Sequence, residues 1–327
     1  MTQLGEYWER PYTKTEVPSL SEVWAKKYLD KLEEQDRSLN NLSRTQLHID
    51  VAKMLKELLR PISAQAWSKT ESLLSHEIRR HQISAELIDP WSISKDAHQV
   101  YEKALSAYAD KTSPERLSVA IASDIGHIRK HHTAADPRVI GFVSMQFHYC
   151  GQILIDQAPD TEQIPLSAYF KVIDDHLYMP LQRAYDAAAR YDYDAPQLQT
   201  VRNLLPHSSK IAANVVDQVN QLYPTYTSYT GLLSSQAVRI SSIRDVEMFQ
   251  VYIWTCVLEQ NIAAIQQELF PLCVMLYPKL NVSWELVRQM LYLLQNEFLR
   301  YGQACDQALY KPYYESLWRI FSDAVVN

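Results

Sequence analysis

One uncharged stretch constrains the fold of this 327-residue chain more than any other feature. Residues 248–258, MFQVYIWTCVL, lie within a longer segment, residues 242–277, that has the pattern of a single helix. The stretch is apolar on nearly every side, so other elements must enclose it. It is about 11 residues long, well short of the roughly 20 that cross a bilayer, and Glu247 and Glu259 bracket it. We therefore predict a buried central helix over about residues 242–270 and no transmembrane segment.

The rest of the chain favours an all-α fold. Helix-start signals recur, among them a capping box at Ser19–Glu22 and the pairs Ser113-Pro114 and Asp136-Pro137. Pro61 is expected to end a helix that begins near Ser43. No segment alternates as a strand does, so we predict a bundle of about 10–13 helices with no sheet.

Composition and charge exclude several classes of function. The six glycines are scattered, which disfavours phosphate-binding loops and dinucleotide fingerprints. The net charge is -6, and residues 133–327 hold 13 basic and 19 acidic side chains, which disfavours nucleic acid as a partner. Residues 1–132 are charge-balanced, so we divide the chain into two helical regions, 1–132 and 133–327, which could also form one continuous domain. The N-terminus lacks an apolar signal core, and we expect a cytoplasmic protein.

Cysteine and tyrosine usage adds two expectations. The four cysteines lie in apolar helical stretches without metal-binding spacing, and we expect them to be buried, reduced thiols. No nucleophile motif is present, so no catalytic residue is assigned. Tyrosine occurs 21 times, several copies in loops or at helix ends. Most of these rings should pack in the core, and a subset gathered on one surface would mark a protein-binding face.

A possible metal site lies near the end of one predicted helix. Asp124, His127 and His131 occupy positions i, i+3 and i+7 and so share a helix face. The competing interpretation is a basic last turn that complements the helix dipole, and we favour it because a helical di-iron site needs further carboxylates.

A polar stripe on the next helix is a second candidate site. Ser144, His148 and Gln152 recur every four residues on an otherwise apolar helix over residues 137–157. A buried hydrogen-bond network to the central helix, for example to Thr255 or Glu259, is the favoured explanation, because buried polar groups must be paired. The alternative is a small-molecule pocket formed by Ser144, His148, Gln152 and Glu259.

Residues 174–176, Asp-Asp-His, also resemble a metal or acid–base cluster. Consecutive helical residues point about 100 degrees apart, so all three cannot face one site. We predict that they form a solvated helix face.

Two stretches resemble known sequences. RKHHTAADPRVIGFVSMQFHYCGQ (129–152) and DDHLYMPLQRAYDAAARYDY (174–193) are similar to uncharacterised all-helical proteins of cyanobacteria. The resemblance implies a role in a photosynthetic bacterium and no catalytic residue. Our leading hypothesis is a non-enzymatic protein that binds another protein, as scaffold, assembly factor or regulator, with a second copy of the chain as a further candidate partner. The alternative is a helical protein, possibly an enzyme, that holds a small ligand or metal between helices 114–157 and 242–270; no particular cofactor is indicated.

Overall fold

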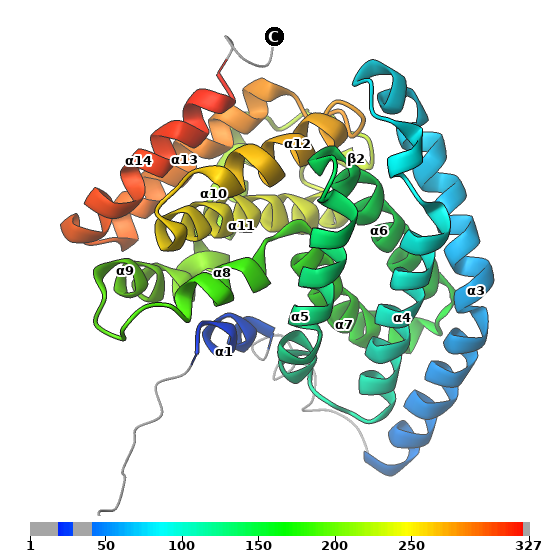
Figure 1. Cartoon of the computed structure of the whole chain (residues 1–327). Helices are drawn as coiled ribbons and strands as arrows, with labels where there is room; N and C mark the ends of the chain where they lie inside the picture. The colour runs from blue at the N-terminus through cyan, green and yellow to red at the C-terminus, as the bar shows by residue number, and fades with distance from the viewer. Residues whose placement is uncertain (1–18, 29–40, 323–327) are drawn as a thin grey trace, which may run out of the picture.

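The computed structural model describes residues 19–28 and 41–322, and within these ranges almost all regular structure is helical (Figure 1). The all-α prediction is confirmed. The first part of the chain forms α1 (Leu20–Ala25), α3 (Asn41–Arg80), α4 (Pro90–Ala109), α5 (Pro114–Thr133), α6 (Ile140–Gln157) and α7 (Asp160–Tyr178), with short 3-10 turns at Lys26–Tyr28, Ala85–Leu87 and Pro137–Val139.

The second part continues the helical pattern. It forms α8 (Leu181–Ala188), α9 (Pro196–Leu204), a 3-10 turn (Leu205–His207), α10 (Ser208–Leu222), α11 (Gln236–Glu259), a π-helical turn (Ile265–Leu269), α12 (Phe270–Leu276), α13 (Trp284–Tyr301) and α14 (Ala304–Ile320). Figure 1 shows α3 to α7 on one side of the molecule and α13 and α14 on the other. None of the described helices is long and apolar enough to span a membrane.

α11 is the buried helix that the uncharged stretch predicts. Every residue from Val246 to Leu258 is buried. The predicted extent needs correction, because the helix begins at Gln236 and ends at Glu259 rather than continuing to residue 270. Gln260 has a φ of 54°, in the left-handed region, and this turn breaks the helix before the π-helical turn begins.

Two further expectations are corrected. Pro61 lies inside α3, which is 40 residues long and ends at Arg80. Proline removes one helical hydrogen bond, but Leu59 and Ile62 on either side of it are buried and pack in the core, and this packing outweighs the local loss. A sheet also exists, although it is only a hairpin of two residues per strand, β1 (Thr227–Ser228) and β2 (Gly231–Leu232), which pair antiparallel.

One hydrophobic cluster extends across the predicted division at residue 132. It contains side chains from Leu20 to Phe321. α5, which ends at that division, packs against α7 and α8, and α1 packs against α5 and α8. The N-terminal helices are therefore joined to the C-terminal ones through a shared core.

Candidate functional site

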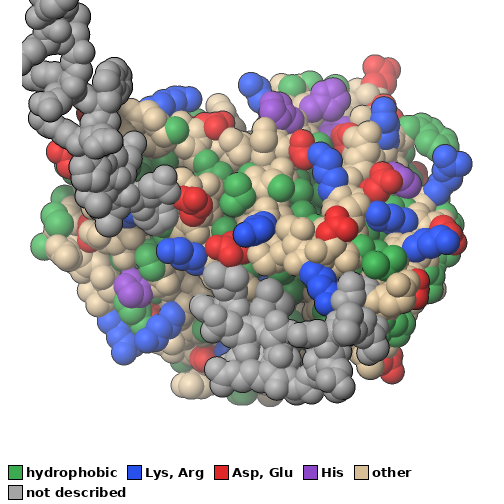
Figure 2. All heavy atoms as spheres, turned by 90° about the horizontal axis from the view of Figure 1, so that it is seen from below, with side chains coloured by type: hydrophobic (Ala, Val, Ile, Leu, Met, Phe, Trp, Pro, Cys, Tyr) green, Lys and Arg blue, Asp and Glu red, His purple; other side chains and the backbone are tan. Residues whose placement is uncertain are grey.

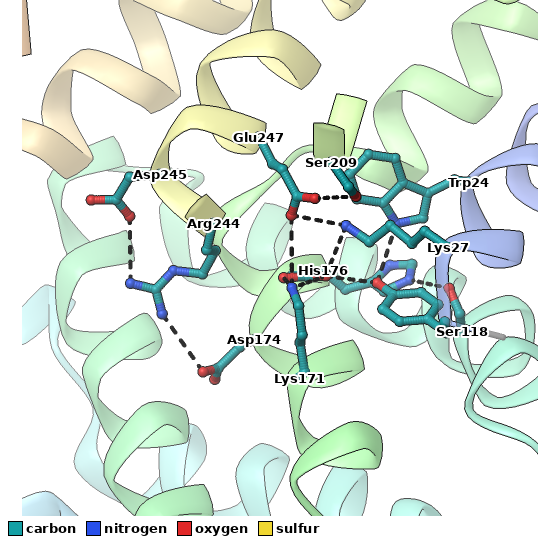
Figure 3. A network of polar contacts seen from close by, with 12 residues as sticks. Trp24, Lys27, Ser118, Lys171, Asp174, His176, Ser209, Arg244, Asp245 and Glu247 are labelled. Atoms are coloured by element: carbon teal, nitrogen blue, oxygen red, sulfur yellow. Dashed lines mark hydrogen bonds and ion pairs between the residues drawn. The ribbon is translucent and has the colours of Figure 1, made fainter. Parts of the chain in front are cut away.

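Four charged side chains meet beside α1 (Figure 3). Lys27 follows α1, Asp175 and Lys171 come from α7, and Glu247 comes from α11. The Lys27 Nζ lies 3.2 Å from Asp175 and 3.0 Å from Glu247, and Lys171 donates to both Asp175 oxygens at 2.8 Å. Asp175 and Glu247 are almost fully buried. This buried charge cluster ties the segment before residue 29 to the two helices.

Neighbouring polar groups complete the hydrogen bonding of the cluster. The Tyr28 hydroxyl donates to Asp175 at 2.8 Å, and the Ser209 hydroxyl donates to Glu247 at 2.6 Å. The predicted capping box at Ser19 is confirmed and sets the start of α1, the helix that directly precedes Lys27 and Tyr28. Trp24 lies under the Lys27 ammonium, 3.6 Å from the ring centroid. Each buried carboxylate therefore has several donors.

The two carboxylates remain ionised despite their burial. Burial alone would raise the pKa of Asp175, but the adjacent Lys171 and Lys27 ammonium groups hold it well below its usual range. Burial would also raise the pKa of Glu247, but the Lys27 and Lys171 ammonium groups outweigh it and lower the pKa. The cluster thus holds two cations and two anions, which is the pairing that buried charges require.

His176 is a neutral, buried imidazole. Its Nε2 lies 2.9 Å from the Ser118 hydroxyl of α5, and burial lowers its pKa to about 3. The expectation that residues 174–176 form a solvated face is therefore wrong for Asp175 and His176. The geometric argument is confirmed, since the three side chains point to different partners, and Asp174 turns toward His148 and Arg244.

Arg244 connects α11 to α6 and α7. Its guanidinium lies over the Tyr178 ring at 3.9 Å, 3.7 Å from Asp174 and 3.4 Å from Asp245. The His148 Nδ1 is 3.3 Å from the same Asp174 oxygen, Oδ2, that Arg244 approaches. The polar stripe of α6 is therefore joined to the central helix through Asp174 and Arg244.

That link replaces the partners that we predicted from the sequence. The Thr255 hydroxyl donates to the Val251 carbonyl of its own helix, and Glu259 pairs with Arg183 at 2.6 Å. Ser144 is fully buried, and its hydroxyl has no hydrogen-bond partner among the described residues. Sequence reasoning missed Arg244, whose partner Asp174 is distant along the chain.

His148 and Gln152 line a pocket beneath the β1–β2 hairpin. Its volume is about 120 Å³, and Arg244, Asp245 and Tyr229 also line it. Ser144 and Glu259 are not among its lining residues. The structure therefore brings together two of the four residues that we predicted for a ligand pocket.

Glu259 lies instead at a larger cleft between α5 and α8. The cleft has a volume of about 540 Å³. Glu268, in the π-helical turn, bridges Arg129 at 2.6 Å and Arg183 at 2.5 Å. Burial would raise the pKa of Glu268, but the two guanidinium groups outweigh it and lower the pKa. Since π-helical turns often mark functional positions, this cleft is a second candidate site.

The three predicted metal ligands lie on the exposed side of α5. Asp124 pairs with Lys103 at 2.6 Å, and the His127 Nδ1 is 2.7 Å from the Ser123 carbonyl. Within residues 19–28 and 41–322, no three His, Cys, Asp or Glu side chains are arranged to hold a metal ion. Asp124, His127 and His131 remain a sequence-based prediction.

Replacing His127 and His131 together with alanine is expected to leave the metal content and the fold unchanged, because both residues are exposed and only His131 lies in the basic last turn of α5. Elemental analysis of the purified variant and its circular dichroism spectrum check this expectation. A stoichiometric metal that is present in the parent and lost in the variant would establish a metal site.

The cysteines follow the expectation with one exception. Cys150, Cys256 and Cys273 are buried, and burial raises the pKa of the Cys150 and Cys256 thiols to about 12. Cys305, at the start of α14, is exposed. The prediction of four buried thiols is therefore corrected at this residue.

An aromatic groove lies on the surface of α13 and α14. It has a volume of about 470 Å³ and is lined by Tyr292, Gln295, Tyr314, Glu315, Trp318, Arg319 and Ser322. Tyr292 is 51% exposed and Trp318 is 36% exposed. Exposed aromatic rings beside an arginine are typical of the centre of a protein interface.

Comparison with known proteins gives one finding. The model of a family described as phycobilisome protein matches residues 171–320, from α7 to the end of α14. No curated protein and no solved structure matches the chain. The matched segment contains the lining residues of the aromatic groove except Ser322, and three of the four residues of the buried charge cluster, with Lys27 outside it.

Proposed function

We propose that this protein binds a protein of the phycobilisome and acts as a scaffold, assembly factor or regulator of that light-harvesting assembly. The observation that carries the proposal is the family match over residues 171–320. Phycobilisome proteins are an all-helical family of cyanobacteria and red algae, and they assemble with other proteins. The proposal places the chain on the cytoplasmic side of the photosynthetic membrane.

The aromatic groove is the surface that we assign to the partner. All of its lining residues except Ser322 lie within the matched segment, and it combines Tyr292 and Trp318 with charged groups at its edge. Elsewhere on the molecule, in the face seen in Figure 2, basic and acidic side chains of the described residues are interspersed with apolar ones. Charged side chains thus interrupt the apolar ones on this face.

Sedimentation with intact phycobilisomes tests the proposal. The purified chain is mixed with phycobilisomes isolated from a cyanobacterium and centrifuged through a sucrose gradient. We expect the chain to move with the assembly, far below the position that it takes alone. A chain that stays at the top of the gradient, whether or not it self-associates, would contradict a phycobilisome partner.

A further inference from the structure

The pocket beneath the hairpin has a wall that is mostly carbon. Its volume is about 120 Å³, and α6, α11, α13 and the segment after the hairpin supply apolar side chains to it: Met145, Val238, Val287, Met290 and Leu233. An apolar cavity of about 150 Å³ accepts benzene, so this smaller pocket suits a compact group of about five heavy atoms.

The pocket also has a carboxylate that a ligand can reach. Asp245 lines it, and 18% of the Asp245 side chain is exposed. Among the described residues its one ion-pair partner is Arg244, at 3.4 Å, and Arg244 also faces Asp174 at 3.7 Å (Figure 3). Both distances exceed the roughly 2.7–2.9 Å of a strong charge-assisted hydrogen bond. One guanidinium thus serves two carboxylates, and negative charge is in excess at this end of the pocket.

The pKa values of these groups show which sign of charge the surroundings stabilise. Burial raises the pKa of Asp245, and Arg244 opposes this rise only in part. Burial alone would lower the pKa of Arg244, yet Tyr178, Asp245 and Asp174 together raise it. A further cation beside Asp245 would therefore be stabilised, whereas an anion would meet like charge.

Tyrosine side chains at the pocket suit a cation that carries carbon. Tyr178, Tyr229 and Tyr277 line it, and the Arg244 guanidinium already lies 3.9 Å from the centroid of the Tyr178 ring. Aromatic rings attract cations, and methylated ammonium groups are the ligands for which proteins most often use them. Such a group places methyl carbons against an apolar wall while keeping its positive charge.

The hairpin that covers the pocket is held in place by hydrogen bonds. The Tyr229 N–H donates to the Leu280 carbonyl at 2.9 Å, and the Asn281 side chain donates to the Thr227 carbonyl at 2.6 Å. The Tyr226 hydroxyl donates to the Asn281 carbonyl at 2.8 Å. The pocket wall therefore exists before any ligand binds, which lowers the entropic cost of binding.

We infer that this pocket binds a small organic cation of the methylated ammonium class. The methyl groups occupy the apolar wall, and the positive charge lies beside the Asp245 carboxylate. No described residue lines both this pocket and the aromatic groove, so binding of a small cation and binding of the phycobilisome hold or fail separately.

Titration calorimetry with three compounds of similar shape tests the charge preference. Tetramethylammonium, tert-butanol and trimethylacetate each present a compact methylated group, and they are positive, neutral and negative, respectively. At about pH 8, where histidine imidazoles are neutral, we expect saturable binding of tetramethylammonium, about tenfold weaker binding of tert-butanol, and no detectable binding of trimethylacetate. No saturable binding of tetramethylammonium, or equal or tighter binding of either other compound, would overturn the inference.

Asp245→Asn removes the charge and keeps the shape of the side chain. The variant should bind tetramethylammonium about tenfold more weakly than the parent does, because the carboxylate supplies the charge preference, and it should bind tert-butanol as the parent does. Circular dichroism checks that the variant is folded. A folded variant that binds tetramethylammonium as tightly as the parent would show that Asp245 does not hold the cation.

A second variant locates the binding without changing any charge. Ala237 lines the pocket and is exposed, so Ala237→Phe should abolish tetramethylammonium binding without disturbing the core. Ile240→Phe, at a 51% exposed position of the same helix outside the pocket, is the matched control and should bind tetramethylammonium as the parent does. Unchanged binding by Ala237→Phe would place the cation elsewhere and overturn the assignment to this pocket.

Discussion

Replacing Trp254 with alanine is expected to lower the free energy of unfolding by about 3–5 kcal/mol, because the change leaves a cavity in the core. Trp254 is 2% exposed and lies at the middle of the fully buried part of α11. Its ring is 4.9 Å from that of Phe298 and 6.2 Å from that of Tyr310, centroid to centroid. Removing it therefore takes away ring contacts between α11 and both α13 and α14.

Chemical denaturation of the parent and the variant measures this loss. Trp91 offers a matched control, since it is 86% exposed, and Trp91→Ala should change the stability by less than about 0.5 kcal/mol. If Trp254→Ala costs no more than Trp91→Ala, the central helix does not have the enclosed position described above.

The second large effect is expected in the buried charge cluster. Asp175→Ala leaves Lys27 and Lys171 with only Glu247 to pair with, and breaking a buried ion pair costs about 3–5 kcal/mol. Asp156→Ala, at an exposed position in α6, is the control and should have little effect. Denaturation near neutral pH gives both values.

The same cluster predicts how the stability depends on pH. Because the pKa of Asp175 is lower in the folded state than its unfolded value of about 3.9, its contribution is complete above that value. The contribution is lost as the pH falls further, since the unfolded state then binds the proton more readily. The stability difference between the parent and Asp175→Ala should therefore narrow as the pH falls below about 4. A difference that stays constant down to pH values well below this would contradict the assigned ionisation.

Local signals in the sequence predict helix starts and the buried helix well. The caps at Ser19, Ser113 and Asp136 depend on residues within a few positions of each other, and the structure confirms all three. The predicted helix boundaries are wrong where long-range packing determines where a helix ends. The buried side chains of Leu59 and Ile62 stabilise α3 on both sides of Pro61. The left-handed turn at Gln260 has no glycine or proline that would predict it from the sequence.

The candidate sites were less predictable than the fold. Even spacing drew attention to His148 and Gln152, which both line the pocket beneath the hairpin, because a polar stripe on an apolar helix is a local pattern. Asp175 is different, since its burial depends on Lys27, which lies 148 positions earlier, and on Glu247. A carboxylate on a helix looks like a solvated residue until the partners that fold against it are known.

Binding of the aromatic-groove variant tests the central claim most directly. Isolated phycobilisomes are titrated with three proteins, and the bound fraction is measured after sedimentation. The three are the parent, the double variant Tyr292→Ala/Trp318→Ala, and a control, Tyr193→Ala, which removes a 54% exposed ring outside the groove. We expect the groove variant to bind at least about tenfold more weakly than the parent, because exposed aromatic rings carry much of the energy of an interface, and Tyr193→Ala to bind as the parent does. Equal binding by the parent and the groove variant, with both folded, would contradict the account.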